Sequence, residues 1–391
     1  MKITDLRTTV VSVPFRTPDG TPSDTAGITN VLLEIVTDEG LVGLGEAVGQ
    51  PTAIAVRSVI EASRPALIGE RAYNVERIVK RFYAYLGTHH YRGIANNALA
   101  AVEMALWDLL GKRFGCPAYQ LLGGLFRARV SYFYWIPRST PEGMALEAKQ
   151  AVADGFDVLY FKVGFDPFED EAALAAVREA AGPRVKIRID ANEAWTAGVA
   201  IQRISAWERY RLDFVEEPVM YRDVAGLAAV QAAVRVPVAA NQSAWTDFDA
   251  FQIIARRAAD VIVSDPHQVG GLLAFKKVAA MAEVANMPIN KHSSGELGIS
   301  TSASLHVAVT IPNLTDGNQI YANLLVDDVV EDPPRLDAGM LAPTDKPGLG
   351  VALNAEKVAK YAALYQERGQ YVHPYFTRAL GYLLPDPPPS R

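Results

Sequence analysis

VLYFKVG (158–164), VKIRID (185–190) and LDFVEEP (212–218) are three short runs in the middle of the chain, rich in β-branched and apolar residues. Each run carries a charged residue at or near its end, and the segments between the runs have the length of a helix. The runs are apolar throughout more than alternating, as is typical of parallel strands covered on both faces. This stretch therefore predicts a series of strand–helix units.

The same pattern continues on both sides of this stretch. Comparable runs are VSYFYWI (130–136), VPVAAN (236–241), DVIVSD (260–265), MPINKH (287–292) and a weaker PNLTD (312–316). From the second run onward, the last polar residues are Lys162, Asp190, Glu216, Asn241, Asp265, His292 and Asp316. Successive members of this series lie 24 to 28 residues apart. Seven units after an initial strand predict a (β/α)₈ barrel, because an open doubly wound sheet gives no reason for a polar residue at almost every strand end.

Three of these strand ends offer oxygen ligands for a metal ion. In barrels of this type the active site lies at the carboxyl ends of the strands, so residues there converge on one mouth. Asp190, Glu216 and Asn241 come from neighbouring strands, with no Cys or His among them, which favours Mg²⁺ ahead of Mn²⁺. A surface salt-bridge pair is the alternative for Glu216 and Glu217, but the adjoining Pro218 and the apolar residues before them argue against it.

The remaining strand ends offer groups that can transfer protons. Lys162 lies on the second strand, and Asp265 and His292 lie on the sixth and seventh. A single His is more often a satisfied core residue than a catalyst. An Asp next to it, however, fixes the imidazole orientation and increases its basicity. We therefore expect Lys162 and the Asp265–His292 pair to lie opposite the metal ligands around the barrel.

The N-terminal part of the chain has a different pattern. Residues 2–15 and 31–48 are patterned as strands, and a long helix is expected over 96–114, with Gly115 as its stop. Strands followed by helices describe an α+β unit, which we assign to residues 1–125.

The barrel is then expected over residues 126–350, with its active site at the C-terminal face. Residues 351–391 contain a predicted helix and a Pro-rich tail. We expect this segment to return to the N-terminal unit and pack on it.

Composition limits the classes of partner. The chain has 391 residues and a net charge of −6 without a basic stripe, so no nucleic-acid partner is expected. Its apolar stretches are too short to span a membrane. Cys116 is the only cysteine, which favours a cytoplasmic location. We expect a small-molecule carboxylate substrate and a homo-oligomer.

The chain resembles the enolase superfamily, and within it the mandelate racemase-like and glucarate dehydratase-like enzymes. The motifs that carry the resemblance cover nearly the whole chain and are specific as a set. They are ALWDLLGKRFGCPAYQLLGG (105–124), FKVG (161–164), DANEAW (190–195), VEEP (215–218), SDPHQVGG (264–271), KHSSGE (291–296) and PGLG (347–350).

The resemblance implies roles for individual residues. It implies the three Mg²⁺ ligands and the Asp–His pair named above, and an N-terminal capping domain whose loops cover the barrel mouth. Lys162 matches the second lysine of the family's Lys-x-Lys pair, whereas Tyr160 stands in place of the first. That departure removes one cation that would stabilise an enediolate, so Tyr160 is left to donate a hydrogen bond there. Asn192 matches a residue near the substrate carboxylate.

Further substrate-binding residues are expected from the last strand and from the lid. Asp316 matches an acidic residue of strand eight, although Asn318 could be the functional one instead. Residues 17–29, rich in Gly, Pro, Ser, Thr and Asp, are expected to form a mobile lid loop. His89 and Arg92 belong to a second expected specificity loop, suited to an anionic substrate.

Dehydration of an acid sugar, an aldonate or aldarate, is the reaction that these residues favour. Lys162 or His292 would take the proton next to the carboxylate, and the 3-hydroxyl would leave to give a 2-keto-3-deoxy acid. Racemisation or epimerisation at the α-carbon uses the same residues and stays open. A non-catalytic binding protein is a remote alternative, because little of the catalytic set is missing.

Overall fold

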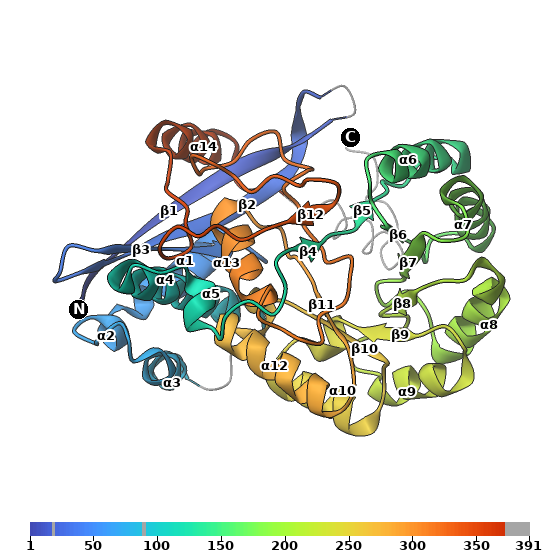
Figure 1. Ribbon diagram of the computed structural model, residues 1–391, viewed down its shortest axis with the longest axis horizontal. Coiled ribbons are helices and arrows are strands. Elements are labelled where there is room, and N and C mark those ends of the chain that lie inside the picture. Colours follow the sequence, from blue (N-terminus) through green and yellow to red (C-terminus); the bar gives the residue numbers. More distant parts are fainter. Residues whose placement is uncertain (18–19, 88–90, 372–391) are drawn as a thin grey trace, which may run out of the picture.

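The computed structural model describes residues 1–17, 20–87 and 91–371, and it contains an antiparallel α+β unit beside a barrel of parallel strands (Figure 1). The α+β unit, called the cap below, has a sheet in the order β1–β2–β3. Its strands are β1 (Ile3–Arg16), β2 (Pro22–Thr37) and β3 (Val42–Val48). Its helices are α1 (Ala53–Ala62), α2 (Arg64–Leu67), α3 (Val75–Leu86), α4 (Asn96–Phe114) and α5 (Ala118–Leu121), with a π-helical turn at Tyr91–Ala95.

Helix α4 is the core of the cap. It packs directly on β3, and most of its residues are buried. A Cβ atom added to Gly45 would lie 1.9 Å from the backbone oxygen of Ala101, so glycine is what allows the helix and the strand to approach. Within the described residues no helix, α4 included, is long and apolar enough to cross a membrane.

The predicted lid loop over residues 17–29 is wrong for most of its length. Strand β2 begins at Pro22 and pairs antiparallel with β1, with Ser12 opposite Thr29 and Val13 opposite Ile28. The register shifts after Pro14, and Arg16 lies opposite Pro22. The polar composition of this stretch suggested a loop, but pairing with the apolar β1 satisfies its backbone and extends the hairpin.

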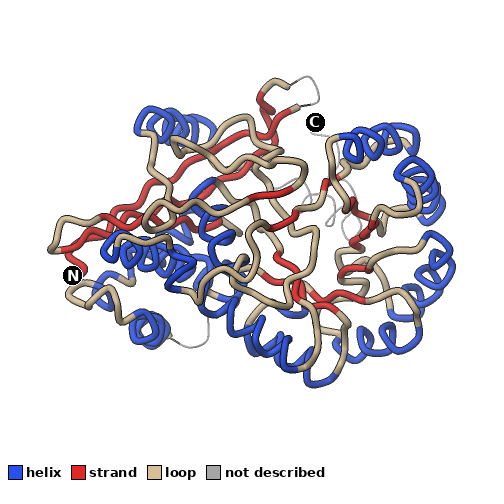
Figure 2. Tube along the Cα trace, viewed as in Figure 1, coloured by secondary structure: helices blue, strands red, loops and turns tan. Residues whose placement is uncertain are grey.

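The barrel has seven parallel strands in the order β11–β10–β9–β8–β7–β6–β5. They are β5 (Tyr134–Trp135), β6 (Val158–Lys162), β7 (Lys186–Asp190), β8 (Phe214–Glu216), β9 (Val238–Ala240), β10 (Val261–Ser264) and β11 (Ile289–Lys291). The helices are α6 (Pro141–Ala153), α7 (Pro167–Ala181), α8 (Ala197–Trp207), α9 (Val224–Ala233), α10 (Asp247–Arg256), α11 (Pro266–Val269), α12 (Leu272–Val284) and α13 (Gly298–Ala308), with 3₁₀ turns at Glu208–Tyr210 and Gln242–Ala244. Figure 2 shows the strands on the inside and most of these helices in an outer layer.

A short irregular segment closes the barrel in the eighth position. Leu314 pairs in parallel with Ile289 of β11, and Asn318 pairs in parallel with Tyr132 just before β5. The weak strand pattern of this segment matches its isolated bridges. The predicted architecture, a cap followed by a (β/α)₈-type barrel, is confirmed.

The C-terminal segment lies against the cap. Helix α14 (Ala355–Arg368) packs on β1 (Figure 1). After it, the Gly369 carbonyl accepts a hydrogen bond from Ser12 Oγ at 3.0 Å, and the Tyr371 backbone N–H donates to Thr29 Oγ1 at 3.0 Å. A further short strand, β12 (Met340–Leu341), pairs with β4 (Val130–Ser131). The Pro-rich tail lies outside the described residues.

Candidate active site

A row of polar side chains crosses the carboxyl ends of four adjacent strands. Lys162 on β6 pairs in register with Asp190 on β7, which pairs with Glu216 on β8. Asn241 directly follows β9, the next strand in the sheet. Side chains alternate faces along a strand, so residues in register on neighbouring strands share one face. The sheet therefore brings these four residues together at one rim.

Asp190 is the best-connected member of this row. Its Oδ2 accepts hydrogen bonds from Lys162 Nζ and from the Tyr160 hydroxyl, the latter at 2.6 Å, and its Oδ1 accepts the Asn192 backbone N–H at 2.6 Å. Lys162 also donates to Asn192 Oδ1 at 2.8 Å. Burial and the charge of Asp190 raise the pKa of Tyr160 well above its usual value, so this hydroxyl keeps its proton. Tyr160 is thus placed to hold Asp190.

The donor set at the rim fits a hard cation. Asn241 Nδ2 donates to the Val263 carbonyl at 3.1 Å, which leaves its buried Oδ1 without a hydrogen-bond partner. Burial, and then the charge of Asp190, raise the pKa of Glu216 well above its usual value, which shows the cost of two adjacent carboxylates. The described residues contain no group of three or more His, Cys, Asp or Glu that could hold a metal ion. Two carboxylates and an amide oxygen remain, a set suited to Mg²⁺.

Glu217 supports this rim from behind and was not singled out as a site residue by the sequence. Its Oε2 accepts the backbone N–H of Asn241 at 2.7 Å, and both the N–H and the hydroxyl of Ser243, at 3.2 and 3.0 Å. Burial raises the pKa of Glu217 to about 8. Its φ of 38° lies in the left-handed region, so the backbone is strained next to Glu216.

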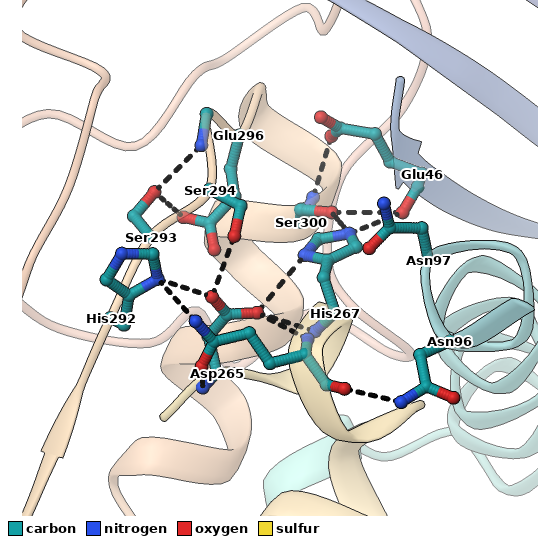
Figure 3. A network of polar contacts seen from close by, with 12 residues as sticks. Glu46, Asn96, Asn97, Asp265, His267, His292, Ser293, Ser294, Glu296 and Ser300 are labelled. Atoms are coloured by element: carbon teal, nitrogen blue, oxygen red, sulfur yellow. Dashed lines mark hydrogen bonds and ion pairs between the residues drawn. The ribbon is translucent and has the colours of Figure 1, made fainter. Parts of the chain in front are cut away.

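Asp265 and His292 form a hydrogen-bonded pair (Figure 3). His292 Nδ1 lies 2.7 Å from Asp265 Oδ2, and Ser294 Oγ donates to the same oxygen at 3.0 Å. Asp265 Oδ1 accepts the backbone N–H groups of His267 and Gln268, at 2.7 and 3.0 Å, as the N-cap of α11. Burial raises the pKa of Asp265, but the hydrogen bond and the charge of His292 outweigh it and lower the pKa to about 2. An ionised Asp265 therefore orients the imidazole.

This pair and Lys162 lie on different sides of the rim. Lys162 ends β6, whereas Asp265 and His292 follow β10 and β11, and the strands with the ligand candidates lie between them. The His292 side chain is 17% exposed and that of Lys162 is 13% exposed, so both keep some access to the mouth. Two side chains capable of proton transfer thus lie partly exposed on two sides of the candidate ligands.

Asp316 is not at the rim, so its predicted substrate contact is wrong. Its carboxylate pairs with Lys186 Nζ at 3.0 Å, and Lys186 is the first residue of β7, at the opposite end from Asp190. The eighth segment reaches the level of the mouth only later, where the Gln319 N–H donates to the Lys291 carbonyl at 2.9 Å. The sequence placed the strand end too early because the segment is irregular.

Other expected substrate contacts have mixed outcomes. Asn192 lies at the rim, as described above. The alternative residue Asn318 is buried and uses its side chain inside the barrel, where its Oδ1 accepts the Lys291 backbone N–H at 2.7 Å. His89 and the side chain of Arg92 lie outside the described residues.

Tyr321 is a residue near the mouth that the sequence did not indicate. Its ring lies 5.7 Å from that of Trp135, edge to face, and 6.0 Å from that of Phe15 of the cap, stacked. Trp135 in turn contacts Tyr160 edge to face at 5.9 Å. The run QIY at 319–321 follows the polar residues of the segment and was the available signal.

Both domains of the chain match known protein families. Residues 3–123 match the family described as mandelate racemase / muconate lactonizing enzyme, N-terminal domain, and residues 143–358 match the family described as enolase C-terminal domain-like.

Individual relatives have different activities at similar identity. The chain is 32% identical to arabinonate dehydratase of Saccharolobus solfataricus over 83% of this chain and 88% of that protein. It is also 32% identical to L-Ala-D/L-Glu epimerase of Bacillus subtilis, over 90% and 97%. The crystal structure of the dipeptide epimerase of Enterococcus faecalis V583, complexed with Mg and the dipeptide L-Leu-L-Tyr, superimposes with a TM-score of 0.81 at 30% identity, over 90% of this chain and 100% of that one.

Proposed function

Because the chain belongs to the mandelate racemase / muconate lactonizing enzyme family of the enolase superfamily, we propose that it is a Mg²⁺-dependent dehydratase of an acid sugar. The observation that carries this proposal is the Asp265–His292 pair on the far side of the rim from Lys162. Dehydration needs one group that takes a proton and one that returns a proton to the departing hydroxyl. This rim offers a candidate for each.

Asp190, Glu216 and Asn241 would hold Mg²⁺. The ion would supply a Lewis acid for the substrate carboxylate and the adjacent hydroxyl. The unpartnered Asn241 Oδ1 and the two buried carboxylates support this assignment. Tyr160 would keep Asp190 in place from the barrel interior, through its 2.6 Å hydrogen bond.

The chemistry at the substrate needs two proton transfers. Lys162 or His292 takes the proton from C2, next to the carboxylate. His292, oriented by Asp265, then donates a proton to the 3-hydroxyl, which leaves as water while the C2–C3 double bond forms. The resulting enol gains a proton at C3 and becomes a 2-keto-3-deoxy acid. Asn192, whose Oδ1 accepts a hydrogen bond from Lys162, would contact the substrate carboxylate region.

The direct test is a screen of the purified protein with Mg²⁺ against mono- and diacid sugars. Formation of a 2-keto product, trapped as its semicarbazone, supports dehydration. Loss of that product in the His292→Asn variant ties the reaction to this site. If no acid sugar of the library yields a keto product, the dehydratase proposal is rejected.

Epimerisation at the α-carbon is the second candidate function. The epimerase relatives support it, being as similar to the chain as the dehydratases, and so do the two proton-transfer groups on different sides of the rim. An epimerase would incorporate solvent deuterium at the α-carbon without losing water. Candidate acids, including dipeptides and acylated amino acids, can be screened in D₂O by mass spectrometry and polarimetry.

A further inference from the structure

Glu46 is a fully buried carboxylate of the cap that contacts the barrel. It lies on β3, and its Oε1 accepts the Leu297 backbone N–H at 2.7 Å while its Oε2 accepts the Ser300 backbone N–H at 2.9 Å. Asn30, on the neighbouring strand β2, donates to Oε1 at 2.7 Å. Burial raises the pKa of Glu46 to about 8, which means that burying the ionised form of this group costs free energy.

Glu46 accepts backbone N–H groups at the start of a barrel helix whose N-cap residue has no acceptor side chain. Helix α13 begins at Gly298, and its N-cap residue, Leu297, has no side chain that can accept a hydrogen bond. The first N–H groups of a helix need acceptors and carry a partial positive charge. Glu46 of the cap and Asp328 of the barrel therefore fix the start of α13 together.

The segment just before α13 carries His292. Residues 292–297 connect β11 to α13, and the cap holds this segment at two further points. Asn30 Nδ2 donates to the Gly295 carbonyl at 2.8 Å, and Gln50 Nε2 donates to the Ser294 carbonyl at 3.1 Å. Ser294 is the residue whose hydroxyl binds Asp265.

Glu46 also contacts the segment that carries Asp265. Its backbone carbonyl lies 3.0 Å from His267 Nε2, and His267 follows Asp265 by two residues at the start of α11 (Figure 3). The same carbonyl accepts Ser300 Oγ at 3.2 Å. One residue of the cap thus contacts both segments on which Asp265 and His292 are placed.

We propose that Glu46 is a positioning residue that sets the geometry of the Asp265–His292 pair from the cap. The inference rests on the proposed function, in which His292 transfers protons to or from the substrate. It ties competence of the barrel to docking of the cap, because Glu46 of the cap accepts two N–H groups at the start of α13. The barrel itself supplies one acceptor there, Asp328 Oδ1, which accepts the Gly298 backbone N–H at 3.1 Å. Loss of these bonds lets the 292–297 segment move, and small displacements of a proton-transfer group are costly, on the order of 10²-fold in rate.

The chain provides a matched control in Glu103. This residue is also a buried carboxylate of the cap, on α4, and it accepts the Leu273 backbone N–H at 3.1 Å at the start of barrel helix α12. Within the described part of the chain it forms no hydrogen bond or ion pair with the 292–297 segment or with His267. Glu103→Gln should therefore loosen cap docking without disturbing the pair.

The experiment compares full-length Glu46→Ala, Glu46→Gln, Glu103→Gln and His292→Asn. Amide hydrogen exchange of residues 292–300 is measured by mass spectrometry, without any substrate. Turnover is measured with the acid sugar that gives the highest rate in the screen, with kcat and KM determined separately. In Glu46→Ala we expect faster exchange in this segment and a kcat lower by ~10²-fold, with KM within about twofold. Glu46→Gln, which keeps one acceptor oxygen, should fall between Glu46→Ala and wild type.

Two results would overturn the inference. One is unchanged exchange and kcat in both Glu46 variants while His292→Asn is inactive. The other is an equal loss in Glu103→Gln, which would show a general effect of cap docking. Full activity of His292→Asn would instead reject the proposed function, and the exchange data would still decide whether Glu46 holds the segment.

Discussion

Replacing Asp265 by Asn tests the proton-transfer assignment, because the structure predicts both the direction and the size of the effect. The carboxylate accepts four donors: the backbone N–H groups of His267 and Gln268, the His292 ring and the Ser294 hydroxyl. An amide has one oxygen for these donors. If that oxygen stays on the two backbone N–H groups, the amide NH₂ faces His292 Nδ1.

His292 must then accept at Nδ1 and carry its proton on Nε2. The ring edge toward the mouth becomes a donor and can no longer act as a base. The same change of tautomer underlies the loss of about 10⁴-fold in turnover when the orienting Asp of a serine protease is made Asn. We expect a loss of at least ~10²-fold here, because Lys162 still provides one proton-transfer group.

The stability of the fold should change with a defined pH dependence. The pKa of Asp265 is lowered from 3.8 to about 2, which corresponds to roughly 2 kcal/mol of stability. A depressed pKa contributes stability that is present above the unfolded-state value and is lost as the pH falls through the folded-state value. The gap between wild type and Asp265→Asn should therefore be largest near pH 7, fall to roughly half of the linked part near pH 3, and fade further below pH 2.

Urea unfolding followed by tryptophan fluorescence at several pH values measures this gap. Ser294→Ala is the matched control, because it removes one donor to the same oxygen and leaves the carboxylate charged. Its unfolding curve should keep the wild-type pH dependence, and its turnover should stay within about tenfold. Parallel pH curves for Asp265→Asn and wild type, or turnover within a few-fold of wild type, would refute the reasoning.

Three further predictions concern the rim and the cap. Chelation should abolish turnover and Mg²⁺ should restore it, and Asn241→Leu should weaken Mg²⁺ binding in calorimetry; full activity of the metal-free protein would reject the ligand assignment. Tyr160→Phe should slow turnover moderately, because Tyr160 supports the candidate ligand Asp190, whereas His292→Asn should slow it by at least ~10²-fold, because His292 transfers a proton. If α-proton exchange in D₂O survives in His292→Asn, Lys162 is the base. Burial raises the pKa of Glu46 to about 8, so this group contributes stability that is present below about pH 4.5 and is lost as the pH rises through 8. Over that range the unfolding free energy of wild type in urea should fall by roughly 4 kcal/mol relative to that of Glu46→Gln, and parallel curves would contradict this.

The sequence predicted the barrel because its signal is local and repeated. Each βα unit places a polar residue after an apolar strand, and the in-register ladder from Lys162 to Glu216 follows from that spacing. The predicted position of Asp316 was wrong because the eighth segment pairs only through isolated bridges, so its polar residues do not mark the strand end. The prediction of a lid loop was wrong because composition alone cannot show that the first part of β2, residues 22–29, belongs to a strand that pairs with β1.

The contacts between the cap and the barrel could not be predicted from the sequence, for a different reason. Glu46 and Leu297 are 251 residues apart, and nothing near Glu46 in the chain indicates a helix start that needs an acceptor. Short-range patterns report which side chains share a strand end, whereas the partners of a buried charge depend on how two domains dock. A buried, ionisable residue of the cap becomes informative only when its contacts are known.

Tyr160 stands where the resemblance to the enolase superfamily implies a lysine, and a tyrosine there would change the charge balance of the rim. Asp190 and Glu216 contribute two carboxylates, and Lys162 is the one cationic side chain that contacts Asp190 in the described residues. A second lysine in place of Tyr160 would compensate the other carboxylate and compete with a metal ion for it. Tyrosine donates a hydrogen bond to Asp190 and adds no charge, so the rim stays more negative and attracts a divalent cation more strongly. In the proposed reaction the cost would fall on the anionic intermediate, which would have one cation fewer near it and would depend more on Mg²⁺ and on the proton from His292. This division of roles explains why a cap residue such as Glu46 would be used to fix the His292 segment: with one lysine absent, the position of the remaining proton donor matters more.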